Sequence, residues 1–165
     1  MRLLPIGLVA GVGAALIASS GASQAPDNQL NPQSVTLLRK GEAALAAGQF
    51  QAADDALETA LVVDPRNRAA FNALAKVAQR QKLYGQAIRY TNKALALEPN
   101  DVNALSIQGE AMVEMGAVAR AQRNLAKVRQ LCGSGACPQG TSLAAAIARG
   151  PAVAQKVTTP APKQN

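Results

Sequence analysis

The chain of 165 residues contains neither histidine nor tryptophan. Histidine is the most frequent general base in enzymes and the commonest metal ligand, so its absence argues against most acid–base catalysts and most metal centres. The sequence also offers no evident pair of a nucleophile and an activating base. We therefore expect a protein that is not an enzyme and that binds neither a cofactor nor a metal ion.

Aromatic residues make up only 2% of the chain, whereas hydrophobic residues make up 48%. Alanine, leucine and valine must then supply the core, and alanine favours closely packed helices. The formal net charge is +7, but the basic residues are not interleaved with aromatic residues that could stack on bases. We expect no nucleic acid partner, and the basic surface faces either an anionic component of the cell envelope or solvent alone.

Residues 1–25 have the composition of a secretory signal peptide. Arg2 provides the positive start, residues 3–18 are apolar, and small residues permit cleavage after Ala22 or Ala25. The alternative is an uncleaved membrane anchor, but the apolar run is short for a span of about 20 residues and is interrupted by glycine. No cysteine lies near the cleavage site, which argues against a lipoprotein. We predict a periplasmic or secreted protein with no stable membrane span after cleavage.

A single repeat period, the spacing from Pro65 to Pro99, organises the rest of the chain, because each of these prolines closes a segment rich in alanine and leucine. The stretch from Arg68 to Pro99 predicts two short amphipathic helices with a break at Tyr84-Gly85. Three units follow this period, at residues 34–67, 68–101 and 102–135. A short helix at residues 142–149, with Thr141-Ser142 as its N-cap, follows them. Residues 26–33 are predicted to be a linker and residues 151–165 a disordered tail.

These units resemble the tetratricopeptide repeat (TPR) family. The family pattern appears in the second unit as Phe71, Leu74, Ala75, Ala78, Ala87, Thr91 and Pro99. The third unit places Leu105, Gly109, Met112, Ala121 and Leu125 at equivalent positions, and the first places Leu37, Gly41, Ala53, Leu57, Ala60 and Pro65. The resemblance implies an all-α fold, a right-handed superhelical solenoid of three TPR helical hairpins plus a C-terminal capping helix. Small residues should let the helices approach, with Phe71, Leu74, Leu83, Ile88 and Leu95 filling the space around them.

The resemblance also implies a scaffold that binds a protein or peptide segment in its concave groove. Carried over by register, the candidate groove residues are Glu42, Asn72, Lys76, Gln79, Arg80, Asn103, Ser106, Glu110 and Glu114. The alternative interpretation of these residues is a solvated helix face with weak ion pairs.

Cys132 and Cys137 are the only two cysteines. An even number of cysteines in an exported protein indicates a disulfide, which would join the last repeat to the capping helix. A redox-active dithiol or half of a metal site is the alternative. Redox motifs usually place two residues between the cysteines, and metal sites need further ligands.

We therefore favour an exported TPR scaffold that assembles or organises a cell-envelope complex, of the secretion, pilus or outer-membrane maintenance type. The alternative is a self-associating structural protein, because the first repeat is acidic and could stack on the basic third repeat or cap of a neighbour. A small redox protein that uses Cys132 and Cys137 is the least favoured hypothesis.

Overall fold

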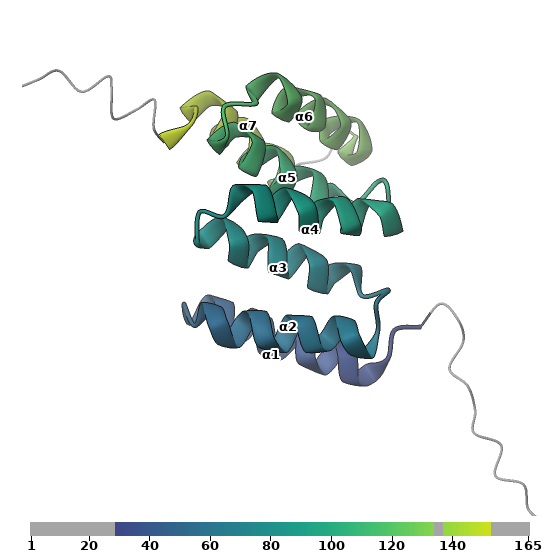
Figure 1. Ribbon diagram of the computed structural model, residues 1–165. Helices are drawn as coiled ribbons and strands as arrows, with labels where there is room; N and C mark the ends of the chain where they lie inside the picture. Colours follow the sequence, from purple (N-terminus) through teal and green to yellow (C-terminus); the bar gives the residue numbers. More distant parts are fainter. Residues whose placement is uncertain (1–28, 134–136, 153–165) are drawn as a thin grey trace, which may run out of the picture.

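The computed structural model describes residues 29–133 and 137–152 (Figure 1). The predicted signal peptide and residues 153–165 of the predicted tail lie outside these residues. Seven helices lie within them: α1 (Pro32–Ala46), α2 (Phe50–Val63), α3 (Arg68–Arg80), α4 (Tyr84–Leu97), α5 (Val102–Glu114), α6 (Val118–Cys132) and α7 (Pro138–Arg149). No strand occurs in the described residues, so the all-α prediction is confirmed.

The helices form three antiparallel hairpins that stack in chain order (Figure 1). Within the hairpins α1 packs on α2, α3 on α4 and α5 on α6, and the last helix, α7, packs on both α5 and α6. Each helix has its main contacts with helices one or two places away along the chain. The predicted solenoid of three helical hairpins plus a capping helix is therefore confirmed.

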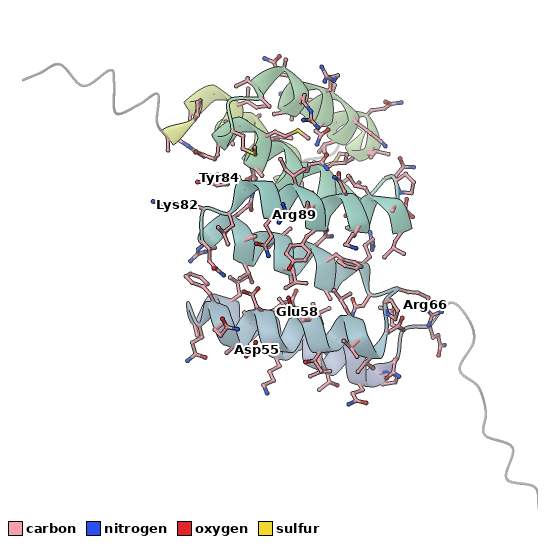
Figure 2. The ribbon with its side chains drawn as sticks, in the orientation of Figure 1. Asp55, Glu58, Arg66, Lys82, Tyr84 and Arg89 are labelled. Carbon is pink, nitrogen blue, oxygen red and sulfur yellow. A yellow bond between two sulfur atoms is a disulfide. The ribbon has the colours of Figure 1, made fainter. Side chains whose placement is uncertain are left out.

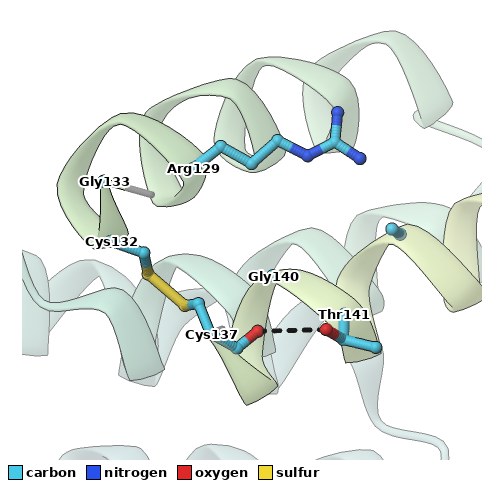
Figure 3. A pocket seen from close by; sticks show the side chains of 7 residues that line it. Arg129, Cys132, Gly133, Cys137, Gly140 and Thr141 are labelled. Atoms are coloured by element: carbon cyan, nitrogen blue, oxygen red, sulfur yellow. Dashed lines mark hydrogen bonds between the residues drawn. A yellow bond between two sulfur atoms is a disulfide. The ribbon is translucent and has the colours of Figure 1, made fainter. Parts of the chain in front are cut away.

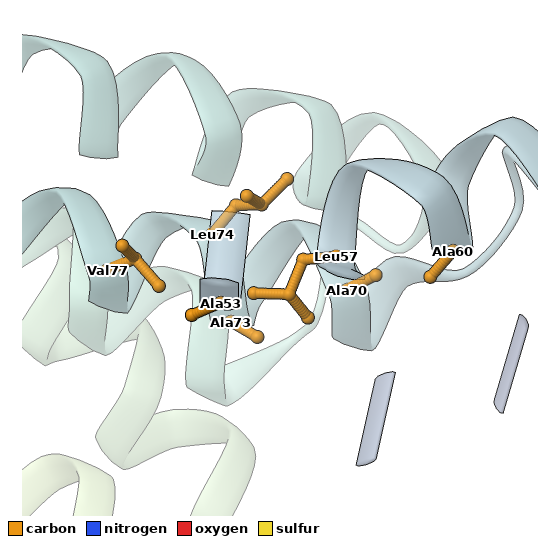
Figure 4. Close-up of a cluster of buried hydrophobic side chains, with 7 residues drawn as sticks. All are labelled: Ala53, Leu57, Ala60, Ala70, Ala73, Leu74 and Val77. Carbon is orange, nitrogen blue, oxygen red and sulfur yellow. The ribbon is translucent and has the colours of Figure 1, made fainter. Parts of the chain in front are cut away.

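The core between the first two hairpins consists of small and branched aliphatic side chains (Figure 4). Leu57 and Leu74 are fully buried among four alanines and Val77. At Gly41 of α1, an added Cβ would collide with Leu57 of α2. The small residues of the repeat pattern therefore set how closely these helices approach. The prediction that Leu83 fills the core is wrong: this side chain is 46% exposed, because it lies in the turn before α4.

The turn inside the second hairpin falls earlier than predicted. The helices are interrupted at residues 81–83, and Tyr84 and Gly85 belong to α4. Lys82 has a positive φ of 62°, its amide donates to Gln79 O (2.9 Å), and the next amide, of Leu83, donates to Ala78 O (2.8 Å). Gly48 and Gly116, located one repeat period to either side of Lys82, have φ values of 73° and 77°. Lysine therefore occupies a helix-ending position that the other two hairpins fill with glycine.

Two helices also begin earlier than predicted, and a proline opens each. α1 starts within the predicted linker because the Asn31 side chain accepts a hydrogen bond from the Gln33 amide (2.8 Å). α7 starts at Pro138 rather than at residue 142, so Thr141 lies in its first turn and donates to the Cys137 carbonyl (3.2 Å). A proline at the first helical position loses no intrahelical hydrogen bond, which explains both starts.

Buried polar residues hold the hairpin junctions together, and they recur at the repeat period. Asn67 precedes α3 and donates from Nδ2 to the hydroxyl of buried Ser34 in α1 (2.8 Å). Asp101, at the equivalent position before α5, accepts from Asn72 Nδ2 (2.7 Å) and pairs with Arg68 Nη1 (2.9 Å). Each junction residue also caps the helix that follows it.

Asp64, which follows α2, is hydrogen-bonded to Asn31, which precedes α1, so it joins the two ends of the first hairpin. Its carboxylate accepts hydrogen bonds from Arg66 Nε (3.1 Å) and from the Asn31 amide (2.9 Å). These bonds, that from the Arg66 side chain above all, lower the pKa of Asp64 to about 2. The carboxylate is therefore charged at any pH above this value.

The outer side of the first hairpin contains an open hollow of about 370 Å³. Its lining residues are Leu37, Lys40, Ala52, Asp55, Ala56 and Thr59. Tyr90, located one repeat period after Ala56, packs against the core between the first two hairpins. The hollow is therefore the place where a preceding hairpin would stack.

Candidate functional site

The candidate site lies between α3, α5 and α7, where two hollows of about 280 and 320 Å³ adjoin. They share Gln79 of α3, Glu110 of α5 and Ser142 of α7 as lining residues. We call the two hollows together the groove. The remaining lining residues are Lys76, Tyr84, Asn103, Ser106, Ile107, Glu114, Pro138, Gln139, Ala145, Ala146 and Arg149.

The structure brings six of the nine predicted groove residues together in this groove: Lys76, Gln79, Asn103, Ser106, Glu110 and Glu114. The other three, Glu42, Asn72 and Arg80, do not line it. Glu42 is exposed on α1 and Arg80 is exposed at the end of α3. Asn72 is only 8% exposed, because it faces the buried junction and donates to Asp101.

Hydrogen bonds from three helices hold the centre of the groove. Glu110 Oε1 accepts from Ser142 Oγ of α7 (2.6 Å), and Ser106 Oγ lies 3.4 Å from the same oxygen. Gln79 of α3 donates from Nε2 to the backbone carbonyl of Ile107 in α5 (3.0 Å). These contacts fix the Glu110 and Gln79 side chains, so the groove is formed in advance of any ligand.

The α7 helix forms one wall of the groove, a role that the sequence analysis missed. Gln139 of α7 donates from its Nε2 to Asn103 Oδ1 (2.8 Å), and its carbonyl accepts from Ser106 Oγ (2.9 Å). Sequence reasoning assigned this helix only to capping. The sequence did contain a signal for this wall. Small polar residues and alanines alternate with Leu143, and they form a second face of the helix that the core does not need.

The far end of the groove combines an aromatic side chain with a carboxylate. Tyr84 of α4 lies beside Glu114 in the lining. Burial raises the pKa of the Tyr84 hydroxyl, and the negative charge of Glu114 raises it further. Glu114 Oε2 also accepts from the amide of Ala152 (3.0 Å), so the chain that leaves α7 passes this end.

Cys132 and Cys137 lie outside the groove, where the end of α6 meets the start of α7 (Figure 3). Their sulfur atoms are at bonding distance, which is the placement that the predicted disulfide requires. Arg129 and Thr141 line a hollow of about 370 Å³ beside them. Within residues 29–133 and 137–152, no three histidine, cysteine, aspartate or glutamate side chains gather as a metal site would need.

Among residues 29–133 and 137–152, no helix qualifies as a membrane span. The longest of the described helices, α1 and α6, have 15 residues each. None of the helices in the described residues combines the length and the apolar character that crossing a bilayer requires.

Comparisons with known proteins establish the fold. No protein-family model and no curated protein matches the sequence, but solved structures do. The first TPR domain of human RPAP3 is 23% identical with a TM-score of 0.65, over 78% of this chain and 98% of that one. The Sgt2 TPR domain from Aspergillus fumigatus is 21% identical with a TM-score of 0.66, over 82% of this chain and 90% of that one. The TPR2B domain of yeast Sti1 is 18% identical with a TM-score of 0.65, over 72% and 98% of the two chains. The described part of this chain therefore has the tetratricopeptide-repeat fold.

Proposed function

We propose that this protein is a non-enzymatic scaffold that binds a segment of a protein partner in the groove between α3, α5 and α7. The observation that carries the proposal is that six of the nine residues predicted from the repeat register line one preformed groove. Structural neighbours support it, since the first TPR of Spaghetti (RPAP3) was solved bound to the HSP90 peptide SRMEEVD. The second TPR domain of human RPAP3 was solved in complex with an HSP70 peptide.

The chemistry of the groove favours a segment of mixed charge. Lys76 provides a cation on the α3 side, and Glu110 and Glu114 provide carboxylates on α5. Asn103 and Gln79 carry amide groups that suit an extended peptide backbone. A strongly acidic peptide such as SRMEEVD would meet the two glutamates, but Arg149 lines the same end, so we expect a ligand that carries both charges there.

The place of action that we propose is the cell envelope. The support is in the sequence, where residues 1–25 have the charge, apolar run and small residues of a signal peptide. An exported TPR scaffold would assemble or organise an envelope complex through its groove.

A crosslinking pulldown from the native envelope tests the groove. The mature protein would be compared with Lys76→Glu, which reverses a charge in the groove. Lys82→Glu is the matched control, because it makes the same charge change in a turn outside the groove. We expect Lys76→Glu to lose a specific protein that both the mature chain and the control retain. Identical captures by all three folded proteins would reject the groove as the binding site.

Self-association is the second candidate, and the charges of the hairpins favour it. The α2 helix has three acidic residues and no base, whereas α6 has four bases and no acid. Association through these helices would weaken with salt. Sedimentation equilibrium at low and high salt tests it, and a monomer under both conditions would reject it.

A further inference from the structure

Two helices of the solenoid display the same series of two bases and a leucine on one face. On α4 these are Arg89, Lys93 and Leu97, four residues apart and therefore on neighbouring turns of one side. On α6 they are Arg123, Lys127 and Leu131, each one repeat period after its counterpart. We call these six residues the basic ladder. Because they recur at the repeat period, the two rows occupy equivalent positions of successive hairpins.

The two helices that carry the ladder have no acids of their own, and the acids Asp55 and Glu58 on the same side of the molecule belong to α2 (Figure 2). Helices α4 and α6 together contain six basic residues and no acidic residue. Within the described part of the chain, the two ion pairs involve Asp64 and Asp101, both at hairpin junctions. The nearest acid in sequence, Glu98, accepts a hydrogen bond from the Asn100 amide in its own turn (3.0 Å). The positive charge of the ladder is therefore presented to solvent.

Only part of the ladder has a structural role. Lys93 lies over the ring of Phe71, 5.9 Å from its centroid, and the half-buried Lys127 donates to the carbonyl of Pro99 (2.7 Å). The arginines of the ladder are exposed and make no such contact within the described residues. In the first hairpin Asp55 and Thr59 take the places of the arginine and the lysine. The fold therefore does not require bases at these positions.

Apolar side chains complete the ladder. Leu97 is 45% exposed and Leu131 is 39% exposed, each at the last turns of its helix. Figure 2 shows that Arg89 of α4 faces the same side of the molecule as Asp55 and Glu58 of α2. None of the ladder residues lines the groove. This face is thus free to take a second ligand while the groove is occupied.

We propose that the basic ladder docks the protein on the surface of an anionic lipid bilayer. Lysine and arginine side chains are attracted to anionic head groups, and exposed leucines beside them enter the interfacial region. Stacking aromatic residues, which single-stranded nucleic acid would need, are absent from the ladder. The acidic α2 helix of a second copy would offer carboxylates to the bases, but only one large exposed apolar side chain, Val62, to the two leucines. An anionic bilayer satisfies both.

Vesicle co-sedimentation of the full mature protein tests this proposal. The probes are vesicles of phosphatidylcholine alone and of phosphatidylcholine with phosphatidylglycerol, at low and high salt. We expect binding only to vesicles with phosphatidylglycerol, and weaker binding at high salt. The double variant Arg89→Gln, Arg123→Gln should lower the vesicle affinity about 30-fold. The matched control Arg39→Gln, Lys40→Gln removes two charges from α1 and should have little effect.

Three outcomes would overturn the proposal. The first is a failure of the folded protein to bind phosphatidylglycerol vesicles at low salt. The second is an equal loss of affinity in both double variants, which would mean that net charge alone drives binding. The third is tighter binding of the same protein to single-stranded DNA, or a salt-sensitive dimer lost in Asp55→Asn, which would identify a different occupant of the ladder. None of these outcomes depends on the groove, so the two proposals fail separately.

Discussion

At the scale of single residues, Lys82 holds a backbone conformation that L-amino acids with a side chain rarely adopt. Its counterparts Gly48 and Gly116 adopt the same conformation without cost. Lysine itself gives no turn signal, so only the repeat period counted from Gly48 or Gly116 marks this position in the sequence. The loss of glycine at this position is a local weakness of the second hairpin.

We expect Lys82→Gly to raise the free energy of unfolding by about 0.5–1 kcal/mol, because it removes the left-handed strain at this position. The control is Lys82→Ala, which removes the same charge and keeps the strain. Urea unfolding of the three proteins measures the difference. Equal gains in the two variants would show that the charge, and not the backbone, limits stability here.

Two glycines that lie within helices, Gly41 and Gly85, should differ in how replacement by alanine changes the stability of the protein. An added Cβ at Gly41 would collide with Leu57, whereas at Gly85 it would meet nothing within 4 Å. We expect Gly41→Ala to destabilise the protein by roughly 1–2 kcal/mol, since overpacking outweighs the gain in helix propensity. Gly85→Ala, with no such clash, should be neutral or stabilising. Thermal unfolding of both variants decides the point, and a stabilised Gly41→Ala would contradict the packing argument.

At the scale of elements, the first hairpin is closed by one ionised side chain. The pKa of Asp64 is about 2 in the folded chain, below its ordinary value of 3.8. The unfolded chain therefore binds this proton at a higher pH than the folded chain does. It follows that stability is complete above about pH 4 and declines as the pH falls towards 2.

We expect Asp64→Asn to abolish this part of the pH dependence. Urea unfolding between pH 2 and pH 5 would then show a flatter profile for the variant than for the unmodified protein. Asp55→Asn is the matched control, because it makes the same chemical change at an exposed site on α2, away from the hairpin junctions. An unchanged slope in Asp64→Asn would exclude this carboxylate as the source.

The junction of α6 and α7 depends on the two cysteines. We expect no reactive thiol in the unreduced protein, either folded or unfolded in guanidinium. The double variant Cys132→Ser, Cys137→Ser should lose at most about 2 kcal/mol, because the closed loop is short. Thiol titration and unfolding measure both quantities. Two reactive thiols in the unfolded, unreduced protein would mean that the disulfide does not form.

The repeat period predicts the helical hairpins, whereas the exact helix ends depend on local residues that are easily misinterpreted. The repeat period was sufficient to predict the three hairpins, whose helices lie within the predicted units except at the start of α1. The starts of α1 and α7 were missed because a proline at the first helical position looks like a linker residue. The break before α4 was misplaced because Gly85 is a stronger turn signal than Lys82, although it lies within the helix.

The candidate site was predictable only in part, for a related reason. Lys76, Gln79 and Glu110 follow from the register of the first helix in each hairpin. Asn72 has the same register, but its amide bonds to Asp101, and this long-range contact leaves no trace in the local pattern. The wall formed by Gln139 and Ser142 depends on how α7 docks, which no repeat pattern describes.

At the scale of the whole molecule, a solenoid whose helices contact helices one or two places away along the chain should unfold from its ends. We expect α3 to α5 to show the slowest native-state hydrogen exchange, and α7 to exchange at a lower free energy. Two substitutions of the same kind test this, because Leu74 in α3 and Leu143 in α7 are both fully buried.

Both Leu74→Ala and Leu143→Ala should cost about 2–5 kcal/mol locally. The first should speed exchange throughout the described helices, whereas the second should speed it mainly in α7. Equal effects of the two variants on every helix would mean that the molecule unfolds as one unit.

The open hollow beside Leu37 and Ala56 has a consequence for how such a chain changes in evolution. It marks a surface on which a further hairpin could stack, and the junction residues Asn67 and Asp101 recur at one spacing. A duplication in frame of the coding segment for residues 68–101 would therefore bring its own connector and its own stacking surface. Each duplication would add one hairpin to the solenoid. The new hairpin would pack through the same hairpin–hairpin interface that the present ones use.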